Sequence, residues 1–154
     1  MSERKQLIDK ANRIINIPTH WVLQVSVEYT NDSKSMYIFS WNNPEHTEEA
    51  INIIFNAKTQ EIKELNIWED HAMKPGNPES LLIYSKDFLL YYTDLPNLDI
   101  LNVQLLQAAT KTSILFFQEE KAEPAYSFIF NGSQLTKFLC HDEINTYSLS
   151  STSP

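Results

Sequence analysis

The chain has 154 residues, 42% of them hydrophobic, and its 12 basic and 20 acidic residues leave a net charge of −8. This apolar content can form a core, which argues against global disorder. The negative charge disfavours contact with nucleic acid through its phosphates. Cys140 is the single cysteine, so an internal disulfide and a multi-cysteine zinc site are excluded.

The sequence predicts a cytoplasmic protein without membrane contact. After Met-Ser-Glu-Arg-Lys-Gln it enters an amphipathic pattern directly, and its apolar runs are short for a secretory signal or a membrane span. The chain has only two glycines, Gly76 and Gly132. Phosphate-binding loops, dinucleotide turns and nucleophile elbows all need glycine, so we do not expect them here.

In the first half, residues 3–16 are predicted to form a helix that ends before Pro18. Its apolar stripe consists of Leu7, Ile8, Ala11, Ile14 and Ile15. Alternating or continuous apolar residues then predict four strands, at 21–29, 36–41, 50–56 and 61–68. In the fourth strand the apolar residues Ile62 and Leu65 are three positions apart, which breaks the period of two and indicates a bulge.

In the second half, residues 69–77 are predicted to be a linker, and Asn77 is positioned to cap a helix over residues 78–92 that begins with Pro78. Residues 98–109 fit a helix and a strand about equally. Strands are predicted at 113–118, 126–131 and 134–140, and Asn131-Gly132 marks a hairpin between the last two. Residues 144–154 are predicted to be a flexible tail.

Two stretches of the chain resemble each other. Residues 53–57 and 61–65 match residues 128–132 and 134–138, with Phe55 and Phe130 at equivalent places. This echo favours a strand over 98–109 and predicts two related domains, residues 3–70 and 78–143. The expected fold class is α+β, with each helix packed on an antiparallel sheet of three to four strands. The alternative is one long curved sheet with both helices on one face.

A family resemblance supports this organisation. The strand that opens at Trp21, followed by residues 37–41 and 51–62, resembles the PepSY-like domains and is closest to the YcdB-type tandem repeat. The family pattern is hydrophobic-Asp-x-x-Thr-Gly-Glu-Ile, and here Asn56 replaces the Asp while Gln60 replaces the Gly. The resemblance covers roughly residues 3–140. It implies a PepSY-like/cystatin-like fold, a bacterial source, and regulatory or inhibitory contact with other proteins. Family members are usually exported or membrane-attached, which differs from the location expected above.

Histidines beside acidic residues are the candidate metal ligands. The groups are Glu45-His46, residues 69–71 with His71, and residues 141–143 with His141. His and carboxylate side chains could hold a divalent cation at the last two. Polar residues also collect where strands end in water, and no group has ligand spacing on one helix. We therefore expect no metal and no cofactor.

The sequence contains no recognisable catalytic residues. Cys140 and His141 are adjacent on a strand and should point to opposite faces, so they cannot easily act as a nucleophile and its base. Trp41 and Trp68 each end a strand, and they are the candidate residues for a partner-binding surface.

The leading hypothesis is a small acidic, non-enzymatic binding or regulatory module. Its partner would be another protein or itself, with a possible homodimer through edge strands. A second hypothesis is a small-ligand carrier or sensor, with an apolar pocket between sheet and helix lined by Phe116, Phe117, Phe128 and Phe130. A third is an enzyme of unrecognised class.

Overall fold

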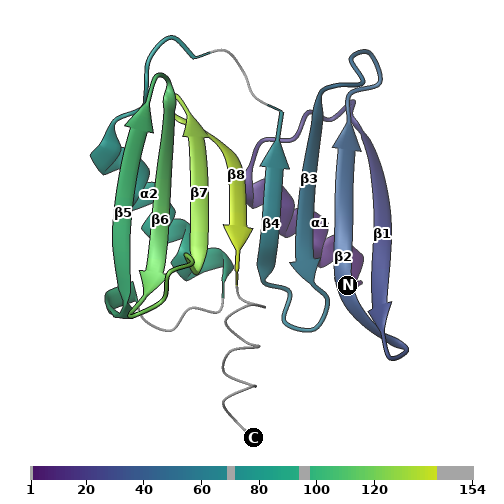
Figure 1. Cartoon of the computed structure of the whole chain (residues 1–154). Helices are drawn as coiled ribbons and strands as arrows, with labels where there is room; N and C mark the ends of the chain where they lie inside the picture. The colour runs from purple at the N-terminus through teal and green to yellow at the C-terminus, as the bar shows by residue number, and fades with distance from the viewer. Residues whose placement is uncertain (1, 69–71, 94–97, 142–154) are drawn as a thin grey trace, which may run out of the picture. The chain divides into compact units, whose positions relative to one another are not determined.

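The computed structural model describes residues 2–68, 72–93 and 98–141. The chain divides into two compact units, Met1–Trp68 and Glu69–Pro154, called the N-terminal unit and the C-terminal unit below. Each unit contains one helix followed by four antiparallel strands, and the helix lies across one face of its own sheet (Figure 1). The predicted α+β class is therefore confirmed. The predicted tail, 144–154, lies outside the described residues.

The N-terminal unit is a helix on a sequential antiparallel sheet. Its elements are α1 (Glu3–Ile14), β1 (Val22–Thr30), β2 (Ser33–Asn42), β3 (Ala50–Asn56) and β4 (Ile62–Ile67), with strand order β1-β2-β3-β4. The Ser2 hydroxyl caps α1 by accepting a hydrogen bond from the Lys5 amide at 3.2 Å. The helix ends two residues earlier than predicted, because Ile15 already has an extended backbone.

One face of this sheet forms the core beneath α1. The helix contributes Leu7, Ala11 and Ile14, all buried. The buried strand residues alternate along β2 and β3 and continue into β4: Tyr37, Phe39, Trp41, Ile51, Ile53, Phe55, Ile62 and Leu65. This period of two places every second side chain in the core and leaves the others on the opposite face.

The C-terminal unit repeats the same order. Its elements are α2 (Pro78–Tyr92), the 3-10 helix η1 (Leu98–Ile100), β5 (Leu101–Ala108), β6 (Lys111–Gln118), β7 (Tyr126–Asn131) and β8 (Gln134–Cys140). The predicted cap is confirmed, since the Asn77 side chain accepts a hydrogen bond from the Ser80 amide at 3.0 Å. Of the ambiguous residues 98–109, the first three form η1 and the next eight form β5, so the segment is mostly strand and contains no α-helix. Regular pairing with β6 along all of β5 provides the backbone hydrogen bonds there.

Phe88 of α2 is the centre of the C-terminal core. Its ring lies 4.7 Å from that of Phe138 and 5.3 Å from that of Phe128, measured between centroids. Phe116, Phe128 and Phe130 are all buried in this cluster, while Phe117 is only half-buried. The predicted ligand pocket lined by these phenylalanines is therefore wrong, because their rings fill the space between sheet and helix.

Both sheets carry a bulge at the same place. The register shifts between Ile54 and Phe55 in the pairing of β3 with β4, and between Ile129 and Phe130 in that of β7 with β8. The bulge predicted from the apolar phase near Ile62 is thus confirmed. Since the two shifts fall at matching positions of the sequence echo, the strands of the two units can be matched residue by residue.

None of the helices in the described part of the chain is long and apolar enough to cross a membrane.

Replacing Phe88 with alanine should destabilise the protein strongly. The substitution leaves a cavity among Phe128, Phe138 and Tyr92, and such large-to-small changes cost about 3–5 kcal/mol. Urea denaturation measures the free energy of unfolding. Tyr91→Ala on the exposed side of the same helix is the control and should cost about 0.5 kcal/mol or less. Equal losses for the two variants would contradict this account of the core.

Candidate functional site

A groove lies on the face of the C-terminal sheet that α2 does not cover, called its open face below. Its volume is about 400 Å³, within the range of about 300–1,000 Å³ that is common for ligand sites. All four strands and the β6–β7 connection contribute to it. The lining residues are Leu106, Ser113, Leu115, Glu123, Pro124, Ser127, Ile129, Lys137, Leu139 and His141.

The strand register explains why the sheet is hollow here. Two rows of side chains cross the open face from β5 to β8. One row is Leu106, Ser113, Ile129 and Lys137, and the other is Gln104, Leu115, Ser127 and Leu139. Ser113 and Ser127 are small, and they lie on the two central strands of the unit, among larger aliphatic side chains. The groove therefore has a polar floor with apolar walls.

The N-terminal sheet provides an internal comparison. Its matching rows are Ser26, Ile38, Ile54 and Glu64, and Gln24, Ser40, Asn52 and Asn66. The second of these rows is entirely polar, and the Ser40 hydroxyl donates a hydrogen bond to the Asn52 side-chain oxygen at 2.7 Å. Glu64 stands where the C-terminal unit has Lys137. The buried faces of the two units are alike, whereas their open faces differ in polarity and in charge.

The charged groups of the groove lie at its two ends. Lys137, Leu139 and His141 follow one another at every second position, and Lys137 is exposed. Four residues of extended chain span about 13 Å, so Lys137 and His141 mark opposite ends of the groove. Glu123 is close enough to His141 to influence its titration. One end is thus cationic, and the other combines a carboxylate with an imidazole.

Ser127 and His141 form a polar pair at that second end. The Ser127 hydroxyl and the His141 Nε2 lie 3.2 Å apart, within hydrogen-bonding distance. Burial lowers the pKa of the His141 imidazole, and the negative charge of Glu123 opposes this in part. A neutral imidazole and a hydroxyl can each donate or accept hydrogen bonds, which suits a ligand with polar backbone or side-chain groups.

Sequence reasoning identified only His141 among these residues. As predicted, Cys140 and His141 separate onto opposite faces, since Cys140 is buried while His141 lines the groove. Ser127, Glu123 and Lys137 were missed. The alternation within β7 and β8 would have placed Ser127 and Lys137 on one face, but only the register brings the two strands' residues side by side.

The two predicted tryptophans differ in exposure. Trp41 is 5% exposed and stacks on Phe39 with ring centroids 5.8 Å apart. Its proposed place on a partner surface was therefore wrong, because its position in β2 points it beneath α1. Trp68 is 38% exposed and remains available for contact.

Of the three histidine groups, only one offers close ligand atoms in the described part of the chain. His46, Glu48 and Glu49 each place a ligand atom within 4.8 Å of the others. His46 and Glu48 are exposed, and their side chains lie 3.8 Å apart. The Glu49 carboxylate already accepts a hydrogen bond from the Asn43 amide group at 2.9 Å. His71 and residues 142 and 143 lie outside the described residues.

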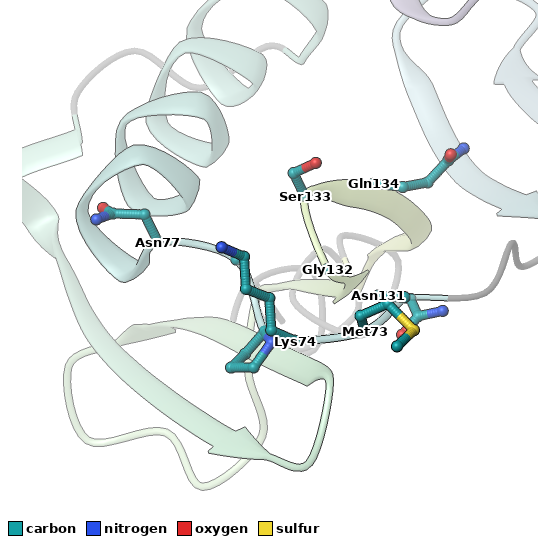
Figure 2. A pocket seen from close by; sticks show the side chains of 10 residues that line it. Met73, Lys74, Asn77, Asn131, Gly132, Ser133 and Gln134 are labelled. Atoms are coloured by element: carbon teal, nitrogen blue, oxygen red, sulfur yellow. The ribbon is translucent and has the colours of Figure 1, made fainter.

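A second hollow of about 750 Å³ lies between residues 72–77 and the β7–β8 turn (Figure 2). The two glycines of the chain meet at its base. Gly132 has a φ of +61°, as the first central residue of a tight hairpin turn requires. A Cβ atom on Gly76 would lie 2.5 Å from the Gly132 carbonyl oxygen and 3.0 Å from Leu81 Cδ1. The segment before α2 therefore packs directly on the turn.

The outward face of α2 carries apolar side chains as well. Ile83, Leu90 and Tyr91 are each more than half exposed. The exposed Asp87 lies among them, so this face is mixed, with more apolar surface than is usual for the solvent side of a helix.

Replacing Gly76 with alanine should destabilise the C-terminal unit. The added methyl group overlaps backbone that cannot easily move, and overpacking of this kind costs about 1–3 kcal/mol. Chemical denaturation gives the change in unfolding free energy. Ser133→Ala, at an exposed position of the same turn, should change it by about 0.5 kcal/mol or less. A Gly76→Ala variant as stable as the parent would show that the close approach is not required.

The lowered pKa of His141 predicts a pH dependence of stability. The unfolded state, with an ordinary histidine pKa of about 6.5, binds more protons than the folded state. This contribution to stability is present above about pH 6.5 and is lost as the pH falls below it. Thermal melting from pH 8 to pH 5 should show a smaller decline for His141→Gln than for the parent. His20→Gln, which removes an exposed histidine, is the control. Identical profiles for His141→Gln and the parent would refute the assignment.

Comparison with known proteins agrees with this architecture. No curated protein matches the chain. Among solved structures, the Bacillus megaterium YpeB C-terminal domain is similar in fold, with a TM-score of 0.67 and 11% identity over 94% of this chain. The chain spans 65% of that structure's length. The family model described as the YcdB, YcdC repeated domain matches residues 4–131. Together with the helix-and-sheet units above, this match shows that the chain belongs to the YcdB/YcdC repeated-domain family and has a PepSY-like fold.

Proposed function

We propose that this chain is a non-enzymatic, cytoplasmic binding module that contacts another protein chain by adding a strand to the outer edge of β5. The observation that supports this most directly is the chemistry of that edge. From Ile100 to Thr110 the sequence contains no charged residue and no proline. Edge strands that avoid pairing with other chains normally carry such residues.

The corresponding strand of the N-terminal unit is protected. β1 contains Glu28, and its register shifts between Glu28 and Tyr29, so that its edge is both charged and irregular. β5 pairs with β6 from Leu101 to Ala108 without a shift. It stands at the end of the strand order, and Val103 and Leu106 are 41% and 52% exposed. A regular, exposed and uncharged edge favours strand addition.

The partner that this edge fits best is a second copy of the chain. Two molecules with a net charge of −8 repel each other over most of their surface, but two β5 edges bring no charges together. In an antiparallel pair with its two-fold axis at Gln104, each Val103 lies opposite Leu105 of the partner subunit. Because one pair of strands buries a small area, we expect a weak, reversible dimer.

The cytoplasmic part of the proposal is supported by the cysteine content. The chain has one cysteine, which is buried, and a chain that cannot form an internal disulfide is typical of a reducing compartment. The non-enzymatic part is supported by the family resemblance, which implies contact with other proteins and supplies no catalytic residues.

Charges placed at Gln104 should control dimer formation. In the proposed register the two Gln104 side chains face each other, so Gln104→Lys and Gln104→Glu should each shift the protein to the monomer by like-charge repulsion. An equimolar mixture of the two variants should restore a dimer. Sedimentation velocity across a concentration series measures the association.

Gln24→Lys is the matched control, because Gln24 occupies the equivalent position in β1. It should leave the association unchanged. A parent protein that remains monomeric at the highest concentration, or a mixture that fails to re-form the dimer, would refute strand addition at β5.

A further inference from the structure

We infer that the open-face groove of the C-terminal unit is a second binding site, which takes an extended protein segment whose apolar residues are flanked by one basic and one acidic side chain. The inference goes beyond the proposed β5 contact, since the groove crosses the sheet face and not its edge. It is carried by the polar floor, the apolar walls and the opposite charges at the two ends.

The walls define the middle of the segment. Leu115, Ile129 and Leu139 are only half-buried on the open face and Leu106 is exposed, so an occupant with aliphatic side chains would remove them from water. Between them, the Ser113 and Ser127 hydroxyls can hydrogen-bond to peptide groups. An occupant with apolar side chains and backbone amides matches both features, whereas a purely apolar molecule would offer no hydrogen bond to Ser113 or to the Ser127–His141 pair.

The ends define the flanking residues. Lys137 and Glu123 are both exposed, so they would pair with opposite charges at the rim of the contact, where ion pairs add specificity and modest affinity. An acidic side chain belongs beside Lys137 and a basic one beside Glu123. The span of about 13 Å between the two ends corresponds to about four residues of extended chain.

The volume favours an extended segment over a helix. A helix about 10 Å across occupies roughly 1,000 Å³ over that length, more than twice the volume of about 400 Å³ in the groove. A helix would therefore contact only the aliphatic side chains at the rim of the groove and would not reach the Ser113 and Ser127 hydroxyls.

The N-terminal unit indicates that these features are specific to this groove. At the matching positions its sheet has Glu64 in place of Lys137 and Asn66 in place of Leu139. The shared fold therefore does not require a lysine or an apolar wall there.

The test uses the full chain and three synthetic peptides with blocked ends. Acetyl-Lys-Leu-Ser-Leu-Asp-amide and acetyl-Asp-Leu-Ser-Leu-Lys-amide present the charges in the two possible directions, and acetyl-Gln-Leu-Ser-Leu-Asn-amide is uncharged. Calorimetric titration should show that one charged peptide binds about two- to fivefold more tightly than the uncharged peptide. Lys137→Glu should remove this advantage, so that this variant binds the charged peptide no more tightly than the uncharged one.

Two further variants keep the result interpretable. Lys58→Glu alters the net charge equally at an exposed position of the N-terminal unit and should bind all three peptides as the parent does. Ser113→Leu fills the hollow and should weaken binding of all three peptides at least tenfold. The inference would be overturned by any of three results. These are no saturable binding, equal affinities for charged and uncharged peptides, and equal effects of Lys137→Glu and Lys58→Glu. Peptide binding at the same strength at protein concentrations where the chain is monomeric and where it is dimeric would separate this site from the β5 contact.

Discussion

Burial of one sheet face beneath its own helix is the constraint on which both units depend. Side chains alternate between the faces of a strand, so a register error of one residue would move an entire apolar set into water. In each unit the bulge between the third and fourth strands lies at the same position. The bulge shifts the alternation of inward and outward side chains by one residue. Ile62 and Leu65 in one unit, and Leu135 and Phe138 in the other, therefore all remain in the core.

The same constraint leaves the opposite face free to change. A substitution on an open face does not disturb the packing beneath the helix, so two related sheets can keep a common core and acquire different surfaces. The N-terminal sheet has a row of polar side chains, two of which, Ser40 and Asn52, are hydrogen-bonded to each other. The C-terminal sheet has serines among aliphatic residues, and a hollow results. The groove is thus a product of side-chain size at a few positions rather than of a change in the backbone.

Most of the large exposed apolar side chains in the described part of the chain lie in the C-terminal unit, although Val22, Tyr29 and Trp68 are exposed in the N-terminal unit. β5 presents Val103 and Leu106, and α2 presents Ile83 and Tyr91. In the N-terminal unit the edge strand β1 carries a charge and an irregular register. Apolar exposure of this kind costs free energy in water, and contact with a partner offsets that cost. The family and fold comparisons establish the architecture, and the contrast between the two units is the basis on which binding is proposed for the C-terminal one.

The sequence by itself predicted most of the elements, their order and the echo between the two halves, because these follow from local patterns. The period of two in β3 and β7, the Asn77-Pro78 helix start and the slipped phase at Ile62 are all properties of neighbouring residues. Residues 98–109 were ambiguous because both periods fit them, and pairing with β6 decided the outcome. Tertiary structure alone decided which face each side chain meets. Trp41 ends a strand in the sequence, yet its face lies beneath α1. Ser127 and His141 are fourteen residues apart and carry no motif, yet the β7–β8 register places their polar atoms 3.2 Å apart. Local periodicity shows that a strand has two faces, but only packing determines which of them is covered and which residues of neighbouring strands come together.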